Sequence, residues 1–370
     1  MELIERIRKS CHFVLQVSST HQLQKMGRIL NTRQKHIAIY KDLIGIKSGF
    51  VLTEEQFIDL AEATHEDIEE ARFVLGGAQK WWQGDQDEFV SIRIENLEAN
   101  IIYVMYSIGA IPDRRTSMDI LRDFIKKQGI DSRTNYWYFS EAVGVASTVL
   151  HITEFFPEML PMPAIDPNIM SLIENFKNSP DYQEFHRRNF MNRNLPLQRE
   201  WDGLLSLSEL FKSEDKPINT IPEQYFDQRY IDYLYAQGSK IQNIQWRQFE
   251  YLTAEYFRRN GYEVEVGRGR GDGGKDVAAR KREGVTGPDL VLIQCKRNAS
   301  SNPVDIDTVK AFWTTINEDG ATKGLIVTTS RLTSGAKTFC DAHRYRLTSA
   351  DGETVRLWLK NLASHQAKAL

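Results

Sequence analysis

The chain has 370 residues, of which 41% are hydrophobic, 11% aromatic and 26% charged. This composition is typical of a folded globular protein and excludes a fibrous or disordered chain, and the length allows two or three domains. The three cysteines, Cys11, Cys295 and Cys340, lie too far apart to indicate a disulfide framework or a structural zinc site, which fits a reducing compartment.

No segment of the sequence indicates export or a membrane span. Residues 1–10 are charged and lack the apolar run of a secretory signal. The longest apolar stretch, 101–111, is far shorter than the roughly 20 residues that a membrane-spanning helix needs. We therefore expect a cytoplasmic protein without a membrane partner.

The net charge of −3 conceals an asymmetry along the chain. From Gly238 onward there are 21 Lys and Arg against 15 Asp and Glu, which gives this part a charge of +6. The preceding part has 26 against 35 and carries −9. Phosphate binding is therefore expected in the C-terminal part of the chain.

Residues 1–155 show apolar side chains at roughly helical spacing, which predicts a helical region. Two aromatic groups within it, Trp81-Trp82 and the group from Tyr136 to Tyr138, could stack on bases but are more typical of a helical core. Prolines and charged residues in 212–223 indicate an interdomain linker. The predicted organisation is a mainly helical domain at 1–211, a linker region at 212–237 and a second domain at 238–370.

The second domain shows a pattern that predicts its elements in the order αβββαβαβα. Its first helix carries an apolar stripe that includes Phe249 and Leu252, and Gly261 stands where a helix C-cap is expected. The predicted elements are a helix at 246–260, strands at 262–266, 275–279 and 290–297, a helix around 309–316, a strand at 324–329, a helix at 334–343, a strand at 344–348 and a last helix around 355–362.

Two polar side chains stand together on the strand at 290–297. Because side chains alternate between the two faces of a strand, Gln294 and Lys296 emerge on the same side. Burying an amide and an ammonium on a mostly apolar strand costs free energy unless an anion or a metal ion interacts with them. Asp276 on the preceding strand can lie beside them if the two strands pair as a hairpin.

These residue types fit the hydrolysis of a phosphodiester. That reaction needs a divalent cation that neutralises the phosphate and activates a water. Asp276 offers a hard oxygen ligand suited to Mg²⁺, and Gln294 and the backbone carbonyl of Cys295 offer neutral oxygens. Lys296 places a positive charge near the attacking water, and Glu250 on the facing helix adds a second carboxylate.

An ordered set of motifs resembles the catalytic domain of Mrr-type restriction endonucleases, members of the PD-(D/E)xK superfamily. The resemblance covers about residues 240–365. The motifs are Phe249-Glu250-Tyr251-Leu252, Gly261-Tyr262-Glu263-Val264, Gly271-Asp272-Gly273-Gly274-Lys275-Asp276-Val277, Ile293-Gln294-Cys295-Lys296-Arg297 and Lys323-Gly324-Leu325-Ile326-Val327-Thr328-Thr329-Ser330.

The resemblance implies a restriction-endonuclease-like αβββαβ domain with a mixed central sheet. The helical spacing of the residues before it predicts an all-α N-terminal region. It also implies that Asp276 is the metal-binding aspartate, Lys296 the catalytic lysine and Glu250 the helix glutamate. Gln294 takes a position that is usually acidic in the superfamily but matches this subfamily's own variant. Losing that carboxylate weakens metal binding in principle, so the charge of Glu250 gains importance.

Simpler interpretations compete at several positions. Taken alone, Glu250 is a solvated helix residue, and Gln294 with Lys296 is an exposed pair on an edge strand. Asp272 is either a further metal ligand or, more often for an aspartate in a glycine-rich turn, a cap of its own backbone.

The glycines at 269–274 satisfy a dinucleotide-binding pattern, but a strand rather than a helix follows them, so the pattern's context is absent. Arg268, Arg270, Arg297 and Ser330 are candidate DNA phosphate contacts. For the two arginines of the glycine-rich turn, plain solvation is an equal alternative. For Ser330 and the two threonines before it, capping of the following helix is the more common role.

The hypothesis is a Mg²⁺-dependent DNA endonuclease, with Mn²⁺ able to substitute, that acts on double-stranded DNA. The resemblance suggests restriction or antiphage defence in a prokaryotic cytoplasm. The acidic N-terminal domain would gate or target cutting in response to an activating partner or ligand, and a homo-oligomer of two or more chains would cut both strands. The alternatives are a repair or recombination nuclease of the junction-resolvase kind, and a catalytically inactive nucleic-acid-binding sensor.

Overall fold

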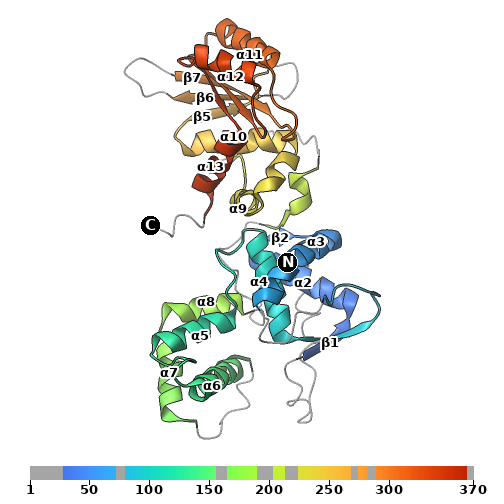
Figure 1. Cartoon of the computed structure of the whole chain (residues 1–370), viewed down its shortest axis with the longest axis vertical. Coiled ribbons are helices and arrows are strands. Elements are labelled where there is room, and N and C mark those ends of the chain that lie inside the picture. Colours follow the sequence, from blue (N-terminus) through green and yellow to red (C-terminus); the bar gives the residue numbers. More distant parts are fainter. Residues whose placement is uncertain are drawn as a thin grey trace. The chain divides into compact units, whose positions relative to one another are not determined.

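The computed structural model describes residues 28–71, 80–155, 165–189, 203–212, 224–267, 274–281 and 289–364. These residues divide into two compact units (Figure 1), one within Met1–Tyr106 and Asp113–Leu204 and the other within Ser107–Pro112 and Leu205–Leu370. No helix among the described residues is both long enough and apolar enough to cross a membrane.

The first unit is mainly helical, as the apolar spacing predicts. Its helices are α2 (Arg33–Ser48), α3 (Glu54–Ala71), α4 (Ile94–Ser107), α5 (Ser117–Lys127), α6 (Tyr136–Phe155), α7 (Pro167–Lys177) and α8 (Pro180–Arg188). Thr116 begins α5 with a capping box, in which its hydroxyl accepts from the backbone of Asp119 and the Asp119 carboxylate accepts from the backbone of Thr116.

The prediction of an all-α N-terminal region is wrong, because the first unit also contains strands, of which β2 (Phe50–Val51) is the shortest. Strand β1 (Arg28–Thr32) pairs antiparallel with β3 (Phe89–Arg93). Both segments are only five residues long, and such short apolar runs show no period that separates a strand from part of a helix. Their pairing joins residues about sixty positions apart in the sequence, which local pattern does not reveal.

The aromatic groups of this unit differ in burial. Trp81 and Trp82 are each 2% exposed and pack edge to face, so the prediction of a core role is confirmed for them. Tyr136 and Trp137 are 61% and 81% exposed, and for these two the core prediction is wrong. They occupy the first turn of α6, whose buried face begins at Phe139.

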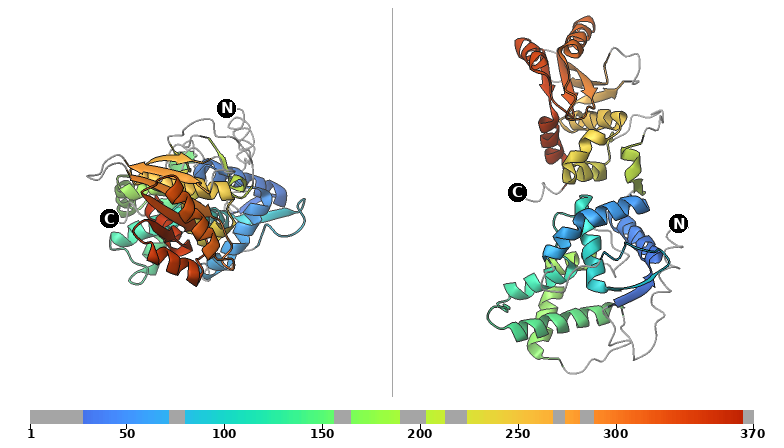
Figure 2. Two further views of the ribbon diagram at one scale, coloured as in Figure 1. Left: turned by 90° about the horizontal axis from the view of Figure 1, so that it is seen from above. Right: turned by 45° about the vertical axis from the view of Figure 1, so that its right-hand side comes forward.

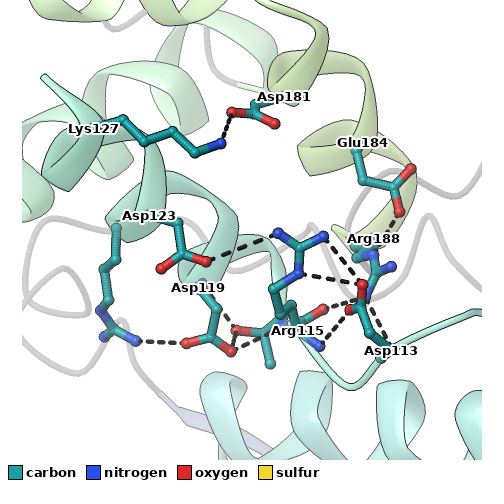
Figure 3. Close-up of polar contacts among 10 residues, drawn as sticks. Asp113, Arg115, Asp119, Asp123, Lys127, Asp181, Glu184 and Arg188 are labelled. Atoms are coloured by element: carbon teal, nitrogen blue, oxygen red, sulfur yellow. Dashed lines mark hydrogen bonds and ion pairs between the residues drawn. The ribbon is translucent and has the colours of Figure 1, made fainter. Parts of the chain in front are cut away.

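Ion pairs join the end of α8 to the segment that leads into α5. The Arg188 side chain is 1% exposed, and it donates to Asp113 at 2.7 Å and to Glu184 at 2.7 Å. Figure 3 shows this cluster, with Arg115 also directed at Asp113. A buried guanidinium without these partners would strongly destabilise the unit, so the cluster uses charge to hold the helices rather than to bind an outside partner.

The second unit confirms the predicted order of elements. It contains α9 (Gln228–Ala236), α10 (Trp246–Arg259), β5 (Glu263–Val266), β6 (Val277–Lys281), β7 (Asp289–Lys296), α11 (Ile306–Glu318), β8 (Lys323–Thr328), α12 (Ser334–Ala342), β9 (Leu347–Ala350) and α13 (Gly352–Leu362), and also the short β4 (Leu205–Ser206) and the 3-10 helices η4 (Leu207–Leu210) and η5 (Gly238–Asn243). Helix α9 lies in the stretch that the prolines predict to be a linker. Strand β6 begins two residues later than predicted.

The sheet is mixed, with strand order β5-β6-β7-β8-β9. The β5–β6 and β6–β7 pairs are antiparallel, whereas β7–β8 and β8–β9 are parallel. The parallel pairs follow from their connections, since α11 and α12 carry the chain back before the next strand begins. The predicted mixed central sheet is therefore confirmed, and β7 lies at its centre.

Helices cover both faces of this sheet (Figure 1 and Figure 2). On one face, Leu292 of β7 packs in a core with Phe312 of α11 and Cys340 of α12. On the other face lie α10 and α13, which stack Tyr256 on Trp358 with ring centroids 4.0 Å apart. Such double coverage explains why the central strand is apolar along most of its length.

Gly324 allows α11 to pack closely against β8. A methyl group at this glycine would overlap Ile316 and also press on Phe312, whose Cε1 would lie 3.2 Å away. We expect Gly324→Ala to lower the free energy of unfolding of this unit by about 1 to 3 kcal/mol, because overpacking forces side chains out of their rotamers.

Gly335→Ala is the matched control for this prediction. The added methyl group meets only Ile306, at 3.7 Å, and lies in the first turn of α12, where alanine favours the helix. Urea denaturation of both variants tests the difference. Equal unfolding midpoints for the two would show that the space at Gly324 does not limit packing.

Candidate active site

The β6–β7 hairpin positions the predicted metal-binding aspartate. The strands pair with Val277 opposite Ile293, as the sequence predicts, and Asp276 immediately precedes β6. The backbone N–H of Asp276 donates to the carbonyl of Ile293 at 3.0 Å. Its carboxylate Oδ2 accepts from the backbone N–H of Cys295 at 2.6 Å. The carboxylate is therefore held against β7 at the residue between Gln294 and Lys296.

Gln294 is 7% exposed and lies over the turn that precedes Asp276. Gly274 in that turn has φ of +81°, and a Cβ on it would overlap Nε2 of Gln294. The Oε1 atom of Gln294 is buried and has no hydrogen-bond partner among the described residues. A buried acceptor without a donor costs free energy, so this oxygen is a candidate ligand for a cation.

The side chain of Cys295 points to the opposite face from Gln294 and Lys296. Its Sγ lies 3.6 Å from the hydroxyl of Thr253 on α10. Alternation along β7 therefore directs Gln294 and Lys296 to the face of the sheet that α11 and α12 cover, at the end of the strand. The predicted pairing of these two side chains on one face agrees with this arrangement.

The electrostatics of Cys295 show that the charged residues gather around it. Burial raises the pKa of its thiol well above the usual range, and the carboxylates of Asp276 and Glu250 raise it further. The ammonium of Lys296 opposes this effect. The hydrogen bond of Asp276 to the Cys295 backbone and the position of Lys296 on β7 place both of these groups at the end of the strand.

Glu250 reaches this region from α10 rather than from the sheet. The helix begins at Gln245, whose side chain accepts from the backbone N–H of Arg247 at 2.6 Å and of Gln248 at 3.1 Å. Glu250 is 3% exposed, so the interpretation of a solvated helix residue is wrong. It approaches β7 from the Cys295 face, not from the face of Gln294.

Arg247 is a residue of this site that the motif comparison does not single out. Its Nη1 donates to Oε2 of Glu250 at 2.6 Å, and its Nε donates to the Tyr251 hydroxyl at 3.1 Å. The guanidinium also lies 6.0 Å from the ring of Trp246 and 5.1 Å from that of Tyr251. The available sequence signal is the spacing of three between an arginine and a glutamate on a helix.

The other predicted contacts are distributed differently. Arg268, Arg270 and Asp272 lie outside the described residues. Arg297 is exposed directly after β7. The Ser330 hydroxyl donates to the carbonyl of Asn302 at 3.0 Å.

The expectation that hydroxyls at the end of β8 cap the next helix is wrong. The Thr328 hydroxyl instead donates to the carbonyl of Lys296 at 2.8 Å, and the Thr329 hydroxyl donates to that of Asn298 at 2.7 Å. These bonds hold the chain that leaves β7. Thr333 caps α12, since its side chain accepts from the backbone of Ala336.

The donors at this site suit a hard cation such as Mg²⁺. The Asp276 carboxylate, Oε1 of Gln294 and the carbonyl of Cys295 are oxygens, as Mg²⁺ prefers, and Glu250 is the second nearby carboxylate. Within the described residues, no three His, Cys, Asp or Glu side chains form a group that could hold a metal. A glutamine in the donor set is consistent with that result.

Gly274 offers a test of how Gln294 is placed. We expect Gly274→Ala to displace the Gln294 amide and to weaken divalent-cation binding by about tenfold or more, as misplacing a ligand's support does at metal sites. Gly261→Ala is the control, because Gly261 has φ of +82° but a Cβ there meets nothing within 4 Å.

Both variants carry the same backbone strain, on the order of 1 kcal/mol. Calorimetry with Mn²⁺ and denaturation with urea separate the two effects. Equal losses of metal affinity in the two variants would contradict a special role for the contact between Gly274 and Gln294.

One comparison with known proteins identifies the character of the C-terminal unit. A family model described as "Restriction endonuclease" matches residues 241–359. A search of curated proteins found no match.

Two solved structures of restriction endonucleases also match. One is MspJI in complex with a 27-mer oligonucleotide, with 19% identity over 41% of this chain and 37% of that chain, and a TM-score of 0.30. The other is the DNA modification-dependent restriction endonuclease AspBHI, with 17% identity over 47% of this chain and 43% of that chain, and a TM-score of 0.30. This chain therefore spans less than half of either protein, and neither score shows a shared overall fold.

The family match includes α10, all five strands of the sheet and the helices between them, together with Glu250, Asp276, Gln294 and Lys296. The match includes no residue of the first unit. Residues 241–359 thus form a restriction endonuclease-like domain of the Mrr catalytic type.

Proposed function

We propose that the C-terminal unit hydrolyses phosphodiester bonds in DNA with the help of a divalent cation, Mg²⁺ or in its place Mn²⁺. The observation that carries this proposal is the hairpin that sets the Asp276 carboxylate beside Oε1 of Gln294, a buried oxygen without a hydrogen-bond partner among the described residues. The family match at residues 241–359 supports the same class of reaction. Both features lie in one unit, so the chemistry does not depend on the placement of the first.

The site residues divide the work of such a reaction. Asp276, Gln294 and the carbonyl of Cys295 would hold the cation, with Glu250 as a further carboxylate. When bound, the cation neutralises the phosphate and lowers the pKa of a water. Lys296 extends from the same face as Gln294 and places its ammonium where it can orient the attacking water and stabilise the developing negative charge.

DNA binding is assigned to the positive surplus of this unit. Arg297 is exposed beside Lys296, and in the sequence Arg268 and Arg270 belong to the glycine-rich segment that precedes Asp276. Ser330, whose hydroxyl holds the neighbouring loop, is the fourth proposed phosphate contact. Contacts to phosphate do not depend on sequence, so they fit a role in binding double-stranded DNA rather than in choosing a target.

The first unit is proposed to control when or where the domain cuts. Its acidic balance disfavours a role as the main phosphate clamp, and it would respond to an activating partner or ligand. Restriction or antiphage defence is the proposed setting. A dimer or larger homo-oligomer would supply one site for each DNA strand.

Cleavage of supercoiled plasmid tests the proposal. We expect Lys296→Ala to reduce the rate of nicking in Mg²⁺ or Mn²⁺ by on the order of 100-fold or more, because a positioned charge or proton donor is lost. We expect Asp276→Asn to abolish the calorimetric signal of Mn²⁺ binding, since it removes the best hard ligand.

Lys310→Ala provides the control, since Lys310 is an exposed lysine of α11. It should cut at the wild-type rate. If wild type, Lys296→Ala and Lys310→Ala all show the same negligible cleavage with any trigger supplied, the domain is an inactive DNA-binding module.

A further inference from the structure

We propose that Arg247 couples the buried carboxylate of Glu250 to the phosphate backbone of DNA. One arm of its guanidinium positions Glu250, and the other arm binds a phosphate oxygen. The proposal rests on the proposed nuclease function and adds a residue to it. Arg247 is thus a positioning residue for Glu250 and a direct DNA contact.

The first arm is set by the ion pair on α10. Nη1 of Arg247 lies 2.6 Å from Oε2 of Glu250, whose side chain is only 4% exposed. A buried carboxylate is strongly disfavoured unless a positive group answers it, and this short contact supplies that group. The arginine therefore offsets the negative charge of Glu250 and fixes the direction of its side chain.

The second arm is open. Nη2 of Arg247 makes no hydrogen bond to the residues that the structure describes, whereas Nη1 and Nε are both engaged. The side chain is 21% exposed, so it lies at the rim of the site and not beneath it. The bond to the Tyr251 hydroxyl, at 3.1 Å, and the nearby rings of Trp246 and Tyr251 limit the directions that the guanidinium can take.

This geometry suits a phosphate group of the DNA backbone. Arginine presents its N–H groups in a rigid planar fork, which matches phosphate oxygens and needs little ordering when it is already held on one side. The guanidinium lies 5.1 Å from the centroid of the Tyr251 ring, and this cation–π contact uses none of its N–H groups. A phosphate at Nη2 would lie next to Glu250 and so at the edge of the proposed metal site.

A consequence follows for the cation. Because Arg247 neutralises Glu250, the site has less negative charge for a divalent metal than its two carboxylates suggest. A phosphate bound to Arg247 competes with Glu250 for the guanidinium. The Glu250 carboxylate is then more available to the cation. Metal and DNA should therefore bind more tightly together than apart.

The first test measures DNA binding without metal. In EDTA, fluorescence anisotropy with a labelled duplex compares Glu250→Gln with the double variant Glu250→Gln, Arg247→Met. Neither variant buries an unpaired carboxylate, so both should fold. We expect the double variant to bind about 10-fold to 100-fold more weakly, as loss of a charge-assisted hydrogen bond predicts.

The dependence on salt gives a second readout in the same assay. The slope of log Kd against log salt concentration should fall by about one when a phosphate contact is lost. Adding Arg247→Lys to Glu250→Gln keeps the charge but not the fork, and should restore the slope with only part of the affinity. Equal affinity and equal slope in Glu250→Gln and the Arg247→Met double variant would overturn the phosphate contact.

The second test measures metal binding without DNA. We expect Arg247→Met in the otherwise native protein to bind Mn²⁺ more tightly than wild type in calorimetry, by about tenfold, because the Glu250 carboxylate is released from its ion pair and can turn to the cation. Damage to the fold would lower the affinity for both Mn²⁺ and DNA. A higher affinity for Mn²⁺ together with a lower affinity for DNA therefore identifies the coupling. Unchanged or weaker Mn²⁺ binding would overturn it.

These measurements also separate this proposal from the proposed function. None of them requires cleavage. If the wild-type protein never cuts plasmid but the DNA and metal effects occur as expected, the nuclease proposal fails while the role of Arg247 stands. If plasmid is cut and Arg247→Met changes neither ligand, the reverse holds.

Discussion

The hydrogen bond from the backbone N–H of Cys295 to the Asp276 carboxylate, at 2.6 Å, is the contact on which the site depends. It joins the aspartate to the one strand that also carries Gln294 and Lys296. The antiparallel register of β6 and β7 makes it possible, with Val277 opposite Ile293. A slip of one residue would send both polar side chains of β7 to the other face. The mixed sheet and its covering helices therefore serve to keep this register.

Charge at the end of β7 is balanced in an unusual way. Gln294 occupies a position where a carboxylate would bind a cation more strongly. Glu250 is buried, and its carboxylate is paired with Arg247 and not with the cation. The charge that favours metal is consequently smaller than in a site with three carboxylates. Unpaired Oε1 of Gln294 contributes a dipole only. A site of this kind gains metal affinity from a bound phosphate, which supplies the missing negative charge.

Much of the C-terminal unit could be predicted from sequence because its signals are local. Strand alternation places Gln294 and Lys296 on one face, and glycines mark the turns. The contacts that could not be predicted are those that depend on packing. The pairing of β1 with β3 joins distant segments. The exposure of Trp137 depends on which face of α6 meets the core, and the bond between Arg247 and Glu250 depends on how deeply α10 is buried.

The surplus of +6 in the C-terminal part does not say which of its cations can meet DNA. Arg258 and Arg259 both pair with Glu255, which is fully buried on α10. These two cations stabilise the fold, because the carboxylate they answer has no water. Lys296 and Arg297, in contrast, have no ion pair among the described residues. Since paired charges produce a weak external field and unpaired ones a stronger field, Lys296 and Arg297 can contribute to the attraction for phosphate next to the candidate active site.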